Sequence, residues 1–509
     1  MNKISKKSRS EFKMFVLEEF VSPDSDVRMI DNFVDSINLT ELGFEDFNNK
    51  VGRPSYPRDI LVKLLLYGYM NGIRTTRKLE KACQVNMELR WLLCELTPAY
   101  RTIGEFRRKH EEAFANVFQK TVQLALIHKF IEGQTIAFDS FPIRASNSRK
   151  NNYKGKKLDH LKNYAQDKLN LYIQELAKDD TYTPEEQDGI EDKIDHYDSQ
   201  LNKYEDIQNT LDEKGINQVS YTDPDSRILP KGDFGNFLGY RIQCAADSKH
   251  SIVCGYEVCN DNDIKHAVSI AKKAKANLGS KGFDGLYDKG YHSGPEMAGL
   301  EKENITPFIS PPSLKKSDVF PTSDFIYDPK TDSHTCPAGQ TMTAAGKWRK
   351  RNNRRVKSYT NPRACRSCDI KSQCTTRKQG RLLVRYDHFQ YVDQNRERIE
   401  NNPDYYKKRA QIIEHIFGTI KRQWKLDHTV LRTKEKVGIE YAIAFTCYNL
   451  KRIKSLFGDN WTEYLNKITA YAYDIPQSAT TLIFKILRTL EIIMYNIFIK
   501  PTKLNYCSG

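Results

Sequence analysis

The pattern of apolar and polar positions divides the chain into helical and strand-like stretches. Residues 11–130 carry apolar positions at helical spacing. In residues 134–145 apolar and polar positions alternate, which predicts a strand. Two more alternating stretches, 237–246 and 251–258, are separated by a short polar turn. This arrangement is typical of a β-hairpin.

Strands and helices then alternate along the chain. A helix is predicted at 263–277, a strand ending at Asp288, a helix from about Pro295, and a strand at 305–310. A hairpin followed by this alternation predicts an α/β fold, with helices on the faces of a mixed sheet.

Two stretches interrupt this order. Residues 157–213 are rich in Lys, Asp, Glu and Gln, with sparse apolar residues at helical spacing. They predict a helical hairpin that is broken near 179–184. Residues 313–400 are basic, contain cysteines and show no clear period, so we expect an irregular region.

The most apolar segment, 481–500, is interrupted by the charged residues Lys485, Arg488 and Glu491. This pattern favours a docked amphipathic helix over a membrane span or an interfacial helix.

The patterns together predict a chain of three parts. The predicted parts are a helical region at 1–130, an α/β core at 131–456 with insertions at 146–236 and 311–400, and a helical tail at 457–509.

Charge adds a class of partner. The 509 residues include 80 Lys and Arg against 65 Asp and Glu, a net charge of +15. This excess favours a polyanion such as nucleic acid, although a basic surface without such a partner has the same composition. The polar start of the chain shows no secretory signal, so we expect a reducing cytoplasm. The eleven cysteines then indicate metal ligands before disulfides.

Three acidic residues stand in settings that suit metal chemistry. Asp139 and Asp288 each end an apolar run, and Glu414 lies on an amphipathic helix at 405–421. Mg²⁺ prefers oxygen ligands, and paired divalent ions activate the attacking oxygen and stabilise the leaving oxygen in phosphoryl transfer. The three carboxylates therefore predict a metal site for this chemistry. Asp247, at the hairpin turn, is the alternative to Asp288.

Basic residues near these carboxylates are candidates for phosphate contacts. The run 347–357 has seven basic residues in eleven together with Trp348, and 77–82 and 102–109 predict short helices with basic faces. The alternatives are a solvated basic loop, a salt-bridged helix face and a plain helical bundle in place of a helix-turn-helix-like unit. The DNA-contact candidates are Lys289, Arg351, Arg354, Arg355, Lys357, Arg409 and Lys421.

A cysteine cluster predicts a second metal. Cys336, Cys365, Cys368 and Cys374 include one C-x2-C pair, and four such thiolates can hold a structural Zn²⁺. His334 is a substitute ligand, and reduced unliganded thiols are the alternative. The other cysteines considered lie in apolar stretches and are expected in the core: Cys83, Cys94, Cys244, Cys254, Cys259 and Cys447.

Several motifs together resemble one enzyme family. The segments 137–140, 287–291 and 409–421 resemble the three acidic motifs of bacterial insertion-sequence transposases of the DDE type. The resemblance as a whole spans about residues 50–455, and it includes further similarities outside the three motifs. They are Gly239–Gln243, Asn262–Asp263, the cysteine-bearing insertion, and the N-terminal segments 52–57 and 101–108.

The resemblance implies an RNase H-like core in which Asp139, Asp288 and Glu414 hold Mg²⁺ or Mn²⁺. It further implies cleavage at transposon ends and strand transfer into target DNA. The expected partners are double-stranded DNA, as terminal inverted repeats and target, and a second copy of the chain. The expected location is the bacterial nucleoid in the cytoplasm, with no membrane.

One spacing departs from the family. The related pattern in this family has one residue fewer between Arg and Glu than the spacing found here, Tyr406-x2-Arg409-x4-Glu414-x6-Lys421. The resemblance therefore supports the family roles of Glu414 and Lys421 more strongly than those of Tyr406 and Arg409. Two other functions are compatible with the same motifs. They are an RNase H-like nuclease without strand transfer and a catalytically inactive DNA-binding protein derived from a transposase.

Overall fold

The computed structural model describes residues 14–44, 54–178, 182–230, 235–312, 319–351, 354–458 and 461. The apolar segment predicted as a helix at 481–500 lies outside this part of the chain. Across the residues described, no helix has both the length and the apolar character that a membrane crossing requires.

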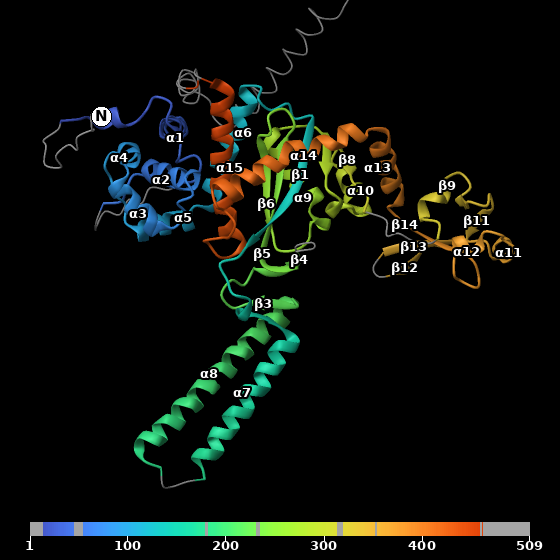
Figure 1. The fold of residues 1–509 in the computed structure, drawn as a ribbon, viewed down its shortest axis with the longest axis horizontal. Helices are drawn as coiled ribbons and strands as arrows, with labels where there is room; N and C mark the ends of the chain where they lie inside the picture. The colour runs from blue at the N-terminus through green and yellow to red at the C-terminus, as the bar shows by residue number, and fades with distance from the viewer. Residues whose placement is uncertain are drawn as a thin grey trace, which may run out of the picture.

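A mixed six-stranded sheet lies at the centre of the molecule (Figure 1). Strand β5 runs antiparallel to its neighbours, while β7 and β8 run parallel to β1, so the order is β6-β5-β1-β7-β8 with β4 beside the start of β5. This confirms the predicted α/β class and is consistent with an RNase H-like core. The strands are β1 (Thr135–Arg144), β4 (Arg227–Pro230), β5 (Asn236–Asp247), β6 (Val253–Cys259), β7 (Phe283–Tyr287) and β8 (Ile305–Ile309).

The two faces of β1 meet different partners because successive side chains of a strand point to opposite sides. On one face Phe138 stacks on Tyr287, with ring centroids 4.3 Å apart. On the other, Phe141 lies 4.6 Å from the ring of Phe417 on α14 (Pro403–Gly418). Asp139 shares this second face with Phe141, so α14 covers the side of the sheet that carries the carboxylate.

Buried asparagines close both outer edges of the sheet. Asn395 of α13 (Phe389–Asn401) accepts a hydrogen bond from Ile309 N and donates one to Ile309 O, at 2.7 and 2.8 Å. Asn449 of α15 (Lys434–Phe457) does the same for Val253, at 2.9 and 2.8 Å. Each side-chain amide replaces a missing neighbouring strand and satisfies backbone groups that would otherwise be buried unpaired.

The N-terminal helices share one hydrophobic core with the sheet. Helix α2 is buried along residues 60–70, and α15 packs against both α2 and α6. Arg74, whose guanidinium is 3.5 Å from the buried carboxylate of Glu440 on α15, joins the two regions further. The helices are α1 (Asp26–Asp35), α2 (Arg58–Met70), α3 (Thr76–Val85), α4 (Met87–Leu92), α5 (Tyr100–Lys109) and α6 (Glu111–Ile127). On the sheet itself pack α9 (Ala267–Leu278) and α10 (Gly294–Lys302).

A long helical hairpin projects from the molecule (Figure 1). It consists of α7 (Gly155–Leu176) and α8 (Pro184–Lys214), with β2 (Asn152–Lys154) and β3 (Gln218–Ser220) paired at its base. The 31 residues of α8 correspond to a length of about 46 Å. Thr183 begins α8 with a capping box, and the hairpin has a small core of its own. The predicted hairpin and its break are therefore confirmed.

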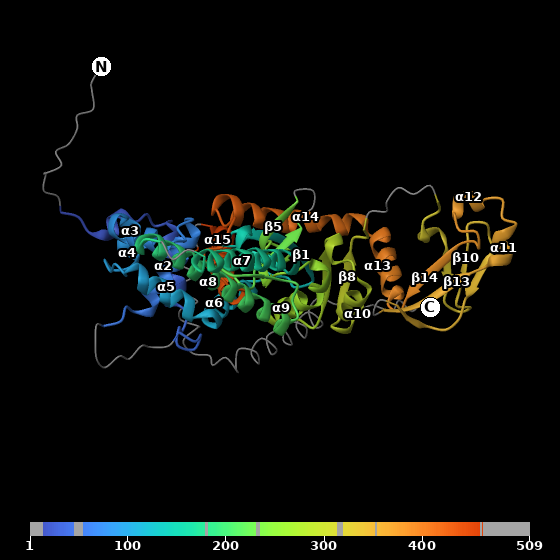
Figure 2. The ribbon, with the colours of Figure 1, turned by 90° about the horizontal axis from the view of Figure 1, so that it is seen from below.

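A second, smaller sheet lies at the far end of the molecule from the N-terminal helices (Figure 2). The expectation of an irregular region at 313–400 is wrong. Most strands here have only three to five residues, and β12 is exposed throughout, so they produce no regular alternation in the sequence. The elements are β9 (Ile326–Asp328), β10 (Ser333–Thr335), β11 (Thr341–Ala344), β12 (Arg349–Arg351), β13 (Arg354–Thr360), β14 (Leu382–Tyr386), α11 (Pro362–Arg366) and α12 (Lys371–Cys374).

Candidate active site

Asp139 and Asp288 lie side by side on neighbouring strands. Strands β1 and β7 are parallel, and Phe138 is paired with Tyr287, so the next residue of each chain segment is an aspartate. Asp288 directly follows β7, as predicted. Asp139 does not end its strand, because β1 continues to Arg144 through its pairing with β5. The parallel register is what brings the two carboxylates together.

Arg409 of α14 lies between the two carboxylates. Its guanidinium donates to Asp139 Oδ2 at 2.7 Å and is 3.9 Å from Asp288 Oδ1. The backbone N–H of Ser140 donates to the other oxygen of Asp139 at 2.7 Å. Burial raises the pKa of Asp139, while Arg409 opposes that shift. In this structure the guanidinium of Arg409 therefore supplies positive charge between the two carboxylates that are predicted to bind the metal ion.

Glu414 is not brought to the two aspartates. It comes five residues after Arg409, which is about 140° around the helix, and its side chain is exposed. The face of α14 that meets the sheet is instead formed by Ile412, Ile413 and Ile416. Within the described ranges, no set of three ligand atoms that includes either aspartate lies within 4.8 Å. Glu414 as a third ligand therefore stays a prediction.

Lys421 approaches the carboxylate face of the sheet. After Gly418 the chain continues as a π-helical segment, Thr419–Gln423, which alters the predicted continuation of the α-helical face. Lys421 Nζ lies 5.2 Å from the ring centre of Phe141, two residues after Asp139. Tyr406 donates to the carbonyl of Tyr287 at 3.0 Å and so fixes the helix beside Asp288.

A polar network that the sequence did not predict links the surroundings of both aspartates. Gln243 donates to Asp263 at 2.7 Å and accepts a hydrogen bond from Tyr291 Oη. Arg241 donates to Asp263 at 3.3 Å and to Ser140 Oγ at 3.4 Å. The network therefore joins the residue after Asp139 to the turn Lys289–Tyr291 after Asp288. Its only sequence signal was the pair of motifs 239–243 and 262–263.

Asp247 has a structural role. Its carboxylate is buried and accepts backbone N–H groups of Glu132, Gly133 and Lys249, at 3.3, 2.8 and 2.9 Å. It is paired with Ile136, three residues before Asp139 on β1. The alternative that placed Asp247 in the metal site is therefore wrong, because its oxygens hold a turn.

The four clustered cysteines line one small pocket beside the second, smaller sheet. Cys336, Cys365, Cys368 and Cys374 all contribute to it, whereas His334 does not and faces the carbonyl of Phe325. The role of His334 as a substitute ligand therefore stays a prediction. Of the six cysteines expected in the core, Cys94 is exposed and the other five are buried.

The basic run 347–357 forms a hairpin, β12–β13, rather than a loop. Lys357 is ion-paired with Asp332, which limits its availability to DNA. Arg355 lies 5.9 Å from the ring centre of Trp348, and Arg351 is exposed. The side chain of Arg354 lies outside the described residues, and Lys289 is exposed directly after Asp288.

A second basic surface lies in the N-terminal helical region. Helices α3 and α5 line an open groove near residues 430–431. Arg107 is buried there and donates to the carbonyl of Arg74 at 2.9 Å, so it holds the groove together. The basic residues that line the groove are Arg77, Lys78, Arg101, Arg107 and Arg108.

Comparisons with known proteins agree with the predicted resemblance. Residues 15–109 match the family model described as "Transposase domain (DUF772)", and residues 335–454 match "Transposase DDE domain". These matches confirm the resemblance to DDE-type transposases. No curated protein matches the chain. The cryo-EM structure of a piggyBac transposase synaptic complex with hairpin DNA is 10% identical and covers 89% of this chain and 83% of that one. Its TM-score of 0.23 is too low to support an argument from shared structure.

Proposed function

We propose, from its resemblance to DDE-type transposases, that this chain cleaves DNA at transposon ends and transfers the resulting 3′-hydroxyl into target DNA. The observation that carries the proposal is the pair Asp139 and Asp288, set side by side by strand register and bridged by Arg409. A partly buried pair of carboxylates is a suitable donor set for a hard divalent cation.

Asp139, Asp288 and Glu414 would hold Mg²⁺ or Mn²⁺. The bound cations would activate the attacking oxygen and stabilise the leaving oxygen. Glu414 would have to turn toward the sheet, since its side chain is exposed on α14. Arg409 would release the aspartates as their charge is met by metal, and its guanidinium would then be available to a phosphate oxygen.

DNA would follow the basic surfaces around this site. Lys289 and Lys421 flank the two aspartates and suit the phosphates nearest the cleaved bond. The groove between α3 and α5 and the exposed Arg351 and Arg355 suit more distant phosphates of double-stranded ends or target. A structural Zn²⁺ held by the four cysteines would brace the small sheet that carries the β12–β13 hairpin.

Two copies of the chain would hold two transposon ends. The α7–α8 hairpin extends beyond the core and exposes Tyr164, Leu171 and Ile173, which makes it the candidate dimerisation element. Its deletion should convert a dimer to a monomer in light scattering. In a bacterial cell the proposed substrate places the protein at the nucleoid.

The decisive experiment is metal-dependent cleavage of the element's own terminal DNA. We would compare the unchanged chain with Asp139→Asn, Asp288→Asn and Glu414→Gln, and use Glu397→Gln, an exposed glutamate on α13, as the matched control. The three site variants should lose cleavage while still binding DNA, and the control should cut normally. Normal cutting by Glu414→Gln would remove that residue from the site.

A second substrate separates the proposal from its alternatives. A pre-cut end with a free 3′-hydroxyl should be joined to target DNA by the parent protein. Cleavage without joining would favour an RNase H-like nuclease, and binding without either reaction would favour an inactive DNA-binding protein.

A further inference from the structure

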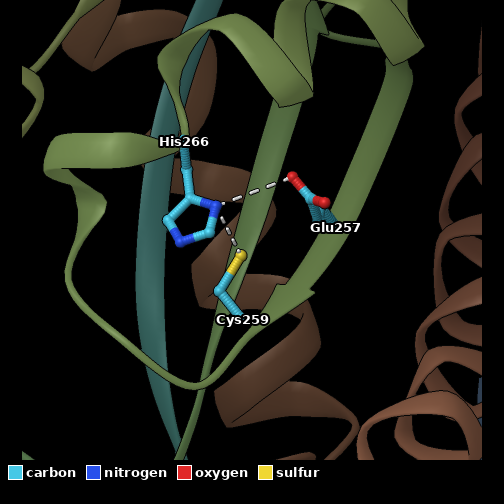
Figure 3. A group of neighbouring side chains, drawn as sticks. All are labelled: Glu257, Cys259 and His266. Carbon is cyan, nitrogen blue, oxygen red and sulfur yellow. Dashed lines mark hydrogen bonds and ion pairs between the residues drawn. The ribbon is translucent and has the colours of Figure 1, made fainter.

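We propose a separate metal site for a zinc-like divalent cation, formed by Glu257, Cys259 and His266. Cys259 ends strand β6, Glu257 lies two residues before it, and His266 directly precedes α9, so the strand end and the helix start meet there (Figure 3). One ligand atom from each residue lies within 4.8 Å of the others. Sulfur, nitrogen and carboxylate oxygen together form a donor set typical of zinc.

The distances between the ligand atoms approach those of a zinc tetrahedron. Zinc bond lengths of about 2.3 Å to sulfur and about 2.0 Å to nitrogen, at tetrahedral angles, place these two ligand atoms about 3.5 Å apart. Here Cys259 Sγ is 3.3 Å from His266 Nδ1, and His266 Nδ1 is 3.9 Å from Glu257 Oε2. Small side-chain adjustments would therefore complete three corners, and water would complete the fourth.

The far side of the histidine ring is already oriented as in metal sites. His266 Nε2 is hydrogen-bonded to the carboxylate of Asp261, which leaves Nδ1 directed toward Cys259 and Glu257 (Figure 3). When Nε2 carries the proton and donates it to Asp261, Nδ1 presents its lone pair to the other two ligands. Metal-binding histidines usually have such an outer carboxylate partner.

The same three side chains could instead be a simple hydrogen-bonded cluster. Glu257 accepts from Ser269 Oγ at 2.7 Å and from Lys273 Nζ at 3.3 Å. These contacts hold the carboxylate in place but leave the buried thiol of Cys259 with only the His266 ring as partner among the described residues. On binding, the cation would displace the thiol proton to solvent and coordinate the thiolate.

The position of the site suggests what it does. Asp263, two residues after Asp261, accepts hydrogen bonds from the side chains of Gln243 and Arg241. These two residues belong to the polar network that reaches the surroundings of Asp139 and Asp288. A cation joining β6 to the start of α9 would brace this turn. The inference does not depend on the proposed DNA chemistry, because metal binding is measured directly.

The test is metal content and affinity of the purified full-length chain. Zinc per chain would be measured by inductively coupled plasma mass spectrometry in the parent, Cys259→Ala and His266→Ala. Cys254→Ala, which removes a buried thiol from the same strand, is the matched control. Each site variant should contain one zinc ion fewer than the parent, and the control should not. The four cysteines of the other predicted zinc site are unchanged in every variant, so zinc bound there would be the same in all samples and would not affect the difference.

A conservative variant covers failure to fold. Glu257→Gln retains the size and polarity of the side chain, and its zinc affinity, measured by competition with a chromophoric chelator, should fall at least tenfold. Circular dichroism would verify folding. Unchanged zinc content in both Cys259→Ala and His266→Ala, equal loss in Cys254→Ala, or unchanged affinity in folded Glu257→Gln would each overturn the proposal.

Discussion

Replacing Arg409 with alanine tests the charge balance between the two aspartates. The guanidinium donates to Asp139 at 2.7 Å, and only 15% of its side chain is exposed. Two unit charges about 4 Å apart at an effective dielectric constant of about 20 attract by about 4 kcal/mol. Removing one partner of a buried pair leaves the other charge uncompensated, which costs about 3 to 5 kcal/mol. Because Asp139 retains some solvent contact, we expect a loss of about 3 kcal/mol.

The assay is thermal unfolding in chelator and in Mn²⁺. In chelator, Arg409→Ala should unfold several degrees below the parent, while Lys407→Ala, an exposed change on the same helix, should not. Adding Asp139→Asn to the variant should recover much of the loss, since no buried charge then remains. Mn²⁺ should raise the midpoint more in Arg409→Ala than in the parent, because the arginine no longer competes for the carboxylates.

Two results would refute this reasoning. If Arg409→Ala unfolds with the parent in chelator, the arginine does not neutralise Asp139. If Mn²⁺ shifts both proteins equally, the metal does not occupy the space between the aspartates. A normal Mn²⁺ response of Lys407→Ala is needed in either case to show that the helix surface itself has no effect.

Four further substitutions test a sheet edge, two glycine positions and one ion pair. Asn449→Leu should cost about 3 kcal/mol in urea unfolding by leaving Val253 N and O unpaired; equal stability would show that the edge is hydrated. Gly239→Ala should prevent folding, judged by circular dichroism, because its Cβ would lie 1.9 Å from a backbone oxygen, whereas Gly189→Ala on α8 should stabilise by about 1 kcal/mol. Burial raises the pKa of Asp332, but its hydrogen bonds, led by that from Lys357, outweigh this and lower it to about 2. Its stabilisation should therefore exist above pH 3.8 and vanish as pH falls through about 2, so Asp332→Asn should lower the thermal midpoint at neutral pH but not near pH 2.

Much of the architecture followed from local pattern. Alternation predicted β1 and the β5–β6 hairpin, and helical spacing predicted the α7–α8 hairpin with its break. These features are recoverable because strand and helix periods place apolar side chains on one face of a single element. The same pattern did not predict the second, smaller sheet, where β12 is exposed throughout and shows no alternation of apolar and polar residues.

By itself, the sequence determined most elements of the central fold and the residue types at their ends, including Asp288 directly after β7. Only the tertiary structure decided which side chains meet. Strand order and register placed Asp139 beside Asp288, and the docking of α14 set Arg409 between them, with Glu414 on another face. It also joined Cys259 to His266 and assigned Asp247 to a turn. The physical reason is that a local period encodes burial, whereas contacts across strands and helices depend on how whole elements pack.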